Sequence, residues 1–317
     1  MPKNMLNINN LRLAVLIDAE NVPRNCIKNV LEEIAIYGTP TIKRIYGDWT
    51  NPAVAGWKLS LLENAITPIQ QYSYTSGKNS SDSAMIIDAM DILYSDRTDG
   101  FVIVSSDSDF TRLAIRLREA GQWVIGIGER KTPSAFIAAC NKFTYVEVIR
   151  ANAREQAVLA DDLKAESDES RIMTVSKKSI SRGTDFHHDE AVADSGSTDS
   201  GSSEKSADND DSGSKHQDRQ RDKSSSQARQ RNGKIPTAVI TLIADSVADL
   251  ADDTGVVFMG ELGNLILKKQ PDFDHRNFGF KSLSAMIKSI DRFVTDFRQT
   301  TDPNIKHVYV RDKDASQ

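Results

Sequence analysis

Four aspartates stand where an α/β fold places its reactive groups. The first follows the apolar run 11–17, the second begins the helical stretch 84–93, and the last two follow the apolar run 101–105. Short apolar runs bounded by turn signals predict buried strands of a parallel sheet, and ligands bind beyond the carboxyl ends of such strands. We therefore expect one crevice to collect Asp18, Asp82, Asp107 and Asp109.

Four ionised carboxylates in one crevice repel each other at neutral pH unless a cation neutralises them. Mg²⁺ or Mn²⁺ suits this role, because a hard ion takes carboxylate and water oxygens as ligands. Such an ion activates water for attack on a phosphodiester. The first histidine of the chain is His187, which excludes a histidine base or a His-rich zinc site before it. The four aspartates are thus the candidates for both the catalytic and the metal-binding roles.

A structural role competes with this interpretation, because an aspartate after a strand often caps the following helix. Asp109 is placed to cap a helix that begins near residue 110, and Asp82 to cap the helix at 84. The amide of Asn21 either faces the metal or caps a helix at residue 22. Asp88 is interpreted as part of the polar side of its helix.

Strand-like and helix-like segments alternate over the first 150 residues. Strands are predicted over residues 11–17, 41–46, 67–74, 101–105, 122–127 and 143–149. This alternation favours a parallel sheet with helices on both faces, a doubly wound α/β/α arrangement of three layers.

The pattern ends at about residue 150. Residues 151–233 are rich in Ser, Asp and Gly and almost free of aromatics, which predicts a disordered linker. Helices are then predicted over 236–250, 259–273 and 280–290, with a terminal hairpin of residues 293–294 and 308–310. This outline is that of a small winged helix-turn-helix domain. The predicted domains are residues 1–150, 151–233 and 234–317.

Composition limits the class of partner and the compartment. The net charge of −5 is not that of a generic nucleic-acid binder, so a nucleic-acid role requires a local basic surface or metal ions. The two cysteines, Cys26 and Cys140, form no disulfide framework, which suits a reducing cytoplasm. No apolar run reaches the ~18 residues of a membrane span. We expect a soluble cytoplasmic protein with no membrane partner.

Three motifs of the first segment resemble the NYN domain, a branch of the PIN-like ribonucleases, in its LabA-like subset. They are Leu16-Ile-Asp-Ala-Glu-Asn21, Lys78-Asn-Ser-Ser-Asp82 and Ser105-Ser-Asp-Ser-Asp-Phe110, within residues 11–149. The resemblance implies a PIN-like sheet of strand order 3-2-1-4-5 and a Mg²⁺-dependent site that cleaves RNA. The metal-binding acids of the family fall on Asp18, Asp82 and Asp107, with Asp109 as the fourth. The first motif has Ala19 where many relatives have Gly.

The last segment resembles the OST-HTH, or LOTUS, domain over residues 235–312. The residues that carry the resemblance are Gly260-Glu-Leu-Gly-Asn-Leu265, Pro271-Asp-Phe273, Phe278-Gly-Phe-Lys-Ser-Leu283 and Val308-Tyr-Val310. This family implies RNA binding or docking of a protein partner.

The expected function is that of a Mg²⁺- or Mn²⁺-dependent ribonuclease whose C-terminal domain, on its long tether, raises the local concentration of RNA or of a protein partner. Polar and basic side chains of both domains are the candidate RNA contacts. They are Asn21, Lys78, Ser106, Arg112, Lys268, Lys269 and Lys281. Ser105, like Ser106, is available to fix the backbone or a phosphate. The alternative is an inactive NYN scaffold that binds RNA or protein; the oligomeric state is left open.

Overall fold

The computed structural model describes residues 11–72, 80–159, 235–252, 254–299 and 306–314. Lys78 and residues 160–233 of the predicted linker lie outside the described residues. Among the described helices, none is both long enough and apolar enough to cross a membrane.

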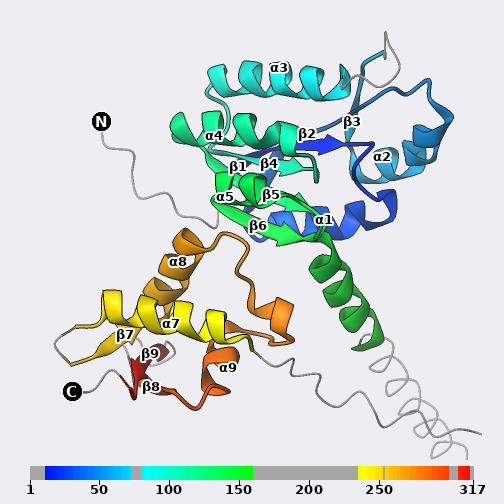
Figure 1. The fold of residues 1–317 in the computed structure, drawn as a ribbon. Coiled ribbons are helices and arrows are strands. Elements are labelled where there is room, and N and C mark those ends of the chain that lie inside the picture. Colours follow the sequence, from blue (N-terminus) through cyan, green and yellow to red (C-terminus); the bar gives the residue numbers. More distant parts are fainter. Residues whose placement is uncertain (1–10, 73–79, 160–234, 253, 300–305, 315–317) are drawn as a thin grey trace, which may run out of the picture. The chain divides into compact units, whose positions relative to one another are not determined.

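A six-stranded parallel sheet forms the centre of the N-terminal domain (Figure 1). Its strands are β1 (Leu11–Asp18), β2 (Gly38–Gly47), β3 (Thr67–Gln70), β4 (Gly100–Val104), β5 (Trp123–Gly128) and β6 (Lys142–Tyr145). Their order is β3-β2-β1-β4-β5-β6, which confirms the predicted doubly wound sheet. The sixth predicted strand extends the implied order 3-2-1-4-5 at one edge. The most buried strands, β1 and β4, are therefore neighbours at its centre.

Helices cover both faces of this sheet because the side chains of each strand alternate between two cores. Leu13, Val15 and Ile17 of β1 face one core, and Ala14 and Leu16 face the other. The first core is covered by η2 (Arg24–Cys26), α1 (Ile27–Ala35), η3 (Pro52–Trp57) and α2 (Lys58–Asn64). The second is covered by α3 (Ser80–Tyr94), η4 (Ser108–Phe110), α4 (Thr111–Glu119) and α5 (Ser134–Ala139). Cys26 and Cys140 are buried free thiols, one in each core.

The C-terminal domain combines short helices with a small antiparallel sheet. Its elements are α7 (Thr237–Leu250), β7 (Val256–Phe258), α8 (Met259–Lys269), η5 (His275–Phe278), α9 (Leu283–Lys288), β8 (Phe293–Gln299) and β9 (Lys306–Asp312). The sheet order is β7-β9-β8, with both pairs antiparallel. The predicted terminal hairpin of β8 and β9 is thus joined by a strand, β7, that was not predicted. The apolar faces of α7, α8 and α9 meet in a core of their own, which includes Ile243, Ile266 and Ile287.

The structure corrects the bounds of several predicted elements. The predicted strand 143–149 is wrong in its second half, because β6 ends at Tyr145 and residues 146–159 are helical. The predicted strand 67–74 shortens to β3, an edge strand that tolerates Pro68. The helix predicted over 280–290 begins only at Leu283, where the Ser282 side chain accepts the Ala285 N–H at 3.1 Å and caps it.

Candidate metal centre

The carboxyl ends of β1 and β4 lie side by side at the centre of the sheet. The two strands pair in parallel up to Ile17 and Val104, so the residues that follow them emerge together. Asp18 is the last residue of β1, and Asp107 follows β4 by three residues. Asp82 lies in the first turn of α3, where the partial positive charge of the helix N-terminus favours an acid.

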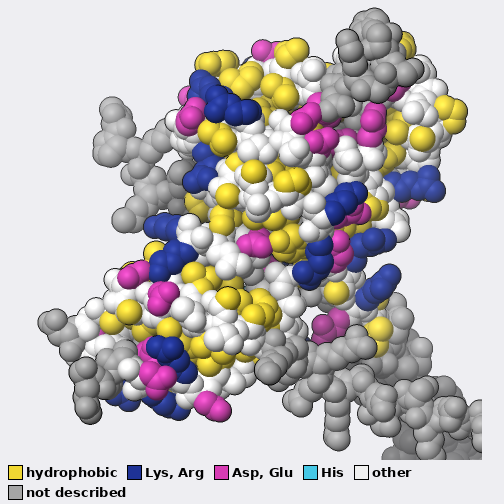
Figure 2. All heavy atoms as spheres, viewed as in Figure 1, with side chains coloured by type: hydrophobic (Ala, Val, Ile, Leu, Met, Phe, Trp, Pro, Cys, Tyr) yellow, Lys and Arg dark blue, Asp and Glu magenta, His cyan; other side chains and the backbone are white. Residues whose placement is uncertain are grey.

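Three of the predicted acids meet in one cluster. Carboxylate oxygens of Asp82, Asp107 and Asp109 all lie within 4.8 Å of one another. Asp82 is buried, Asp107 half-buried and Asp109 exposed, so the cluster opens to solvent on one side. Figure 2 shows acidic side chains gathered around the N-terminal end of α3.

The 3₁₀ turn after β4 decides the roles of Asp107 and Asp109. Asp107 is the N-cap of η4, and its side chain accepts the Asp109 N–H at 2.9 Å. Asp109 lies inside that turn, and α4 has no side-chain cap at its N-cap, Phe110. The alternative of Asp109 as a helix cap is therefore wrong, because the N-cap of η4 is Asp107 and that of α4 is Phe110. Asp82 likewise lies inside α3 instead of before a helix at 84.

Asp18 holds the loops around the cluster and is not among its three members. Its Oδ1 accepts the backbone N–H groups of Glu20 at 3.0 Å and Asn21 at 3.2 Å. Its Oδ2 accepts the Asn21 amide at 2.8 Å and the Ser105 hydroxyl at 2.8 Å. Ser105 Oγ in turn accepts the Asp107 N–H at 3.1 Å. Ser105 thus fixes the backbone, as predicted, and links Asp18 to Asp107.

The cluster concentrates negative charge in partly desolvated surroundings. Burial, followed by the charges of Asp18, Asp107, Asp109 and Glu20, raises the pKa of Asp82 to about 7. Burial and the charges of Asp18 and Asp48 also raise the pKa of Glu20. Among the residues that the structure describes, neither Asp82 nor Asp107 forms an ion pair with a lysine or arginine.

This donor set fits a divalent cation. Three carboxylates that converge within one coordination shell supply hard oxygen ligands, and the exposed side leaves room for water. A cation there would relieve the repulsion that raises the pKa of Asp82. The donor chemistry favours Mg²⁺ or Mn²⁺ over softer ions, because no described histidine or cysteine joins the cluster.

The predicted RNA contacts divide into three groups. Asn21 and Ser106 are engaged within the domain: Asn21 holds Asp18, and Ser106 Oγ accepts the Glu129 N–H at 2.8 Å. Arg112 is exposed on the first turn of α4, close in sequence to Asp107 and Asp109. The predicted contacts of the C-terminal domain, Lys268, Lys269 and Lys281, are exposed, and Lys269 pairs with Asp249 at 2.6 Å.

Asp88 has a structural role that was not predicted, because it was interpreted only as part of the polar side of its helix. Asp88 of α3 accepts hydrogen bonds from the side chains of Arg44 and Tyr46 of β2. These contacts tie α3, and with it Asp82, to the sheet. The spacing of Arg44 and Tyr46 by two residues puts them on one face of a strand, which was the available signal.

Family models match both domains. An NYN domain model matches residues 12–147, and an OST-HTH/LOTUS domain model matches residues 233–305. No curated protein matches the chain.

Two solved structures are similar to parts of the chain. One, a protein of unknown function from Vibrio parahaemolyticus, is 20% identical, with 44% of this chain and 96% of that chain covered and a TM-score of 0.37. The other, an uncharacterized protein from Nitrosomonas europaea, is 34% identical, with 28% and 83% covered and a TM-score of 0.24. The family matches, together with the PIN-like sheet and the small helical domain, establish that the chain carries an NYN domain followed by an OST-HTH/LOTUS domain.

Proposed function

We propose that the protein is a Mg²⁺- or Mn²⁺-dependent ribonuclease of the cytoplasm. The observation that carries the proposal is the convergence of Asp82, Asp107 and Asp109 within 4.8 Å, in an NYN domain. The OST-HTH/LOTUS domain, a class associated with RNA binding, supports RNA as the substrate.

In this proposal Asp82, Asp107 and Asp109 hold the cation, and Asp18 completes the set of four acids. When bound, the cation supplies Lewis-acid activation of water and of the scissile phosphate. Asp18 also keeps Ser105 oriented, and Ser105 keeps the Asp107 backbone in place. Holding the ligands in advance matters because a metal site tolerates little displacement of its donors.

The cations available for RNA lie in both domains. Arg112 is exposed next to the acidic turn and suits a phosphate contact. Lys268, Lys269 and Lys281 supply positive charge on the OST-HTH/LOTUS domain, which is also a candidate surface for a protein partner. Lys78 precedes Asp82 by four residues and belongs to the same proposal.

The test is cleavage of a mixed single-stranded RNA pool by the full chain, with Mg²⁺ or Mn²⁺, and by the variant Asp107→Asn. Asparagine is itself a good N-cap, so the turn after β4 should survive while one anionic ligand is lost. We expect the cleavage rate to fall by on the order of 10³-fold. The matched control is Asp91→Asn, an exposed acid of α3 outside the cluster, which should retain full activity.

Undiminished cleavage by Asp107→Asn would overturn the assignment of the site. RNA retention without turnover at every Mg²⁺ and Mn²⁺ concentration would instead favour the inactive scaffold.

A further inference from the structure

A short segment of the OST-HTH/LOTUS domain, residues 271–277, contacts the free edge of β6. The Phe143 N–H donates to the Pro271 carbonyl oxygen at 2.8 Å. The Tyr145 hydroxyl donates to Asp272 Oδ2 at 2.7 Å. The described residues of the two domains accordingly fall into one compact unit.

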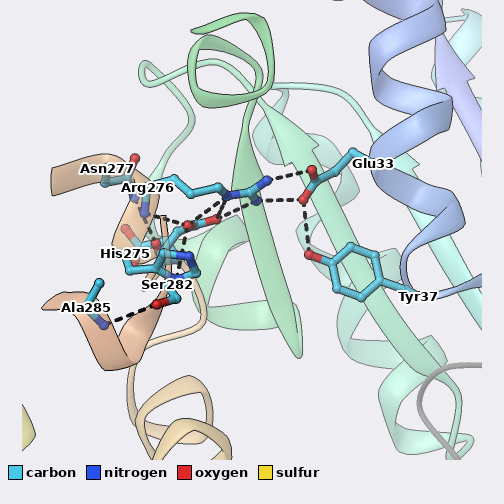
Figure 3. A network of polar contacts seen from close by, with 9 residues as sticks. Glu33, Tyr37, His275, Arg276, Asn277, Ser282 and Ala285 are labelled. Carbon is cyan, nitrogen blue, oxygen red and sulfur yellow. Dashed lines mark hydrogen bonds and ion pairs between the residues drawn. The ribbon is translucent and has the colours of Figure 1, made fainter. Parts of the chain in front are cut away.

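The guanidinium of Arg276, in the same segment, forms a further contact with the N-terminal domain (Figure 3). Arg276 donates to both carboxylate oxygens of Glu33 on α1, at 2.7 and 2.6 Å, and to both oxygens of Asp274, at distances from 2.6 to 3.0 Å. The Tyr37 hydroxyl donates to Glu33 at 3.1 Å. Such paired, charge-assisted hydrogen bonds define an orientation as well as an attraction.

The charges of this cluster balance. Glu33 and Asp274 are 6% and 5% exposed at their side chains, and Arg276 is 18% exposed. The buried ammonium of Lys142 lies 5.8 Å from the Tyr37 ring, and burial lowers the pKa of Lys142. Burial alone would raise the pKa of Asp274, but the Arg276 hydrogen bonds and the charge of Lys142 hold it below its ordinary value. Two buried acids thus face one buried cation, Lys142, and one half-buried cation, Arg276.

Separating the two domains would be energetically unfavourable at the β6 edge and at Glu33. An exposed β6 edge would present unpaired backbone groups, a liability that proteins usually cover. A buried Glu33 without Arg276 would be an uncompensated charge.

We propose that residues 271–277 dock the OST-HTH/LOTUS domain onto β6 and α1, so that the two domains act as one body instead of two modules on a free tether. The docking itself does not depend on nuclease activity. One consequence rests on the proposed function: RNA held by the C-terminal lysines would reach the carboxylate cluster in a fixed orientation.

The test measures a distance between the domains in the full chain. Spin labels are attached to cysteines introduced at two exposed positions, by Glu63→Cys in α2 and Glu261→Cys in α8. The two native cysteines are buried and stay in place, and mass spectrometry checks the number of labels. Docking predicts that pulsed electron paramagnetic resonance will give one narrow distribution of distances between the two labels, with no RNA or metal present. The outcome is therefore separate from that of the cleavage experiment.

Charge reversal then identifies the contact. Glu33→Arg should broaden the distribution through repulsion from Arg276, and the double variant Glu33→Arg/Arg276→Glu should narrow it again. The matched control Glu32→Arg changes an exposed neighbour and should leave the distribution narrow. Circular dichroism checks that each variant is folded. Tyr145→Phe removes only the hydrogen bond to Asp272 and should broaden the distribution partially.

A broad distribution in the parent protein would overturn the proposal, as would a narrow one in folded Glu33→Arg. A double variant that stays broad would also count against it, because the single change would then act by damage and not through the ion pair.

Discussion

Two clusters of acidic side chains in this protein differ in how their charge is compensated. In the cluster of Glu33 and Asp274, the guanidinium of Arg276 contacts both carboxylates and the pKa of Asp274 is lowered. In the cluster of Asp82, Asp107 and Asp109, the acids face one another and the pKa of Asp82 is raised to about 7. The first is neutralised by the chain itself, and the second is suited to a cation from solution.

The difference separates a structural site from a candidate catalytic one. Burial with a fixed partner gives a group one charge state and one position. Repulsion among carboxylates gives a site that is completed only by binding something positive, which is where perturbed pKa values concentrate in enzymes.

The largest expected effect comes from breaking the neutralised cluster. Arg276→Met should lower the free energy of unfolding by about 3 kcal/mol or more, because it leaves Glu33 and Asp274 as buried charges without their main partner. Urea unfolding measures the change. Arg112→Met, an exposed arginine, is the control and should stay near the parent value. An effect below about 1 kcal/mol would mean that the acids are solvated after all.

A cation should produce the next largest effect, at the acidic cluster. Mg²⁺ at 100 times its dissociation constant should stabilise the protein by about 2.7 kcal/mol. Thermal unfolding with and without Mg²⁺ measures this in the parent, in Asp82→Asn and in the control Asp91→Asn. The gain should shrink in Asp82→Asn alone, and an equal gain in all three would place the cation elsewhere.

The same site predicts a pH dependence without metal. Because the folded-state pKa of Asp82 is about 7 and its unfolded value is the ordinary one, the folded state holds more protons between the two. The free energy of unfolding should therefore fall as pH rises through this window, and Mg²⁺ should oppose the fall. A profile in Asp82→Asn as steep as that of the parent would contradict the assignment.

The smallest effect is expected from the link between Asp18 and Asp107. Ser105→Ala removes one donor to Asp18 and one acceptor for the Asp107 N–H, which should cost about 1–2 kcal/mol of stability. Cleavage should fall by about 10-fold if the link positions a ligand. Ser108→Ala, at an exposed position of the same turn, is the control. Equal behaviour of the two variants would remove Ser105 from the site.

Much of the fold followed from periodic patterns that are local in the sequence. The apolar runs ending at Ile17 and near Val104 predicted two central strands, and the spacing of apolar residues predicted the helices around them. Boundaries were less well predicted: nothing local marks the change from strand to helix after Tyr145, because apolar residues there suit both.

The candidate site was predicted in its residue types and only partly in its roles. Asp82, Asp107 and Asp109 meet as expected, but Asp18 lies outside their group with both carboxylate oxygens bonded. Whether an aspartate caps a turn or faces its neighbours depends on the rotation of one 3₁₀ turn, which the residue type does not encode.

The sequence by itself determined the alternating strands and helices, the acids at the strand ends and the order of an NYN and an OST-HTH/LOTUS domain, because these are properties of short segments. Only the tertiary structure decided which acids converge and which acquire a cationic partner. Glu33 and Arg276 are 243 positions apart in the chain, and no local pattern pairs residues at that separation. Charge compensation depends on distance in space, so folding alone distinguishes the neutralised cluster from the one suited to a metal ion.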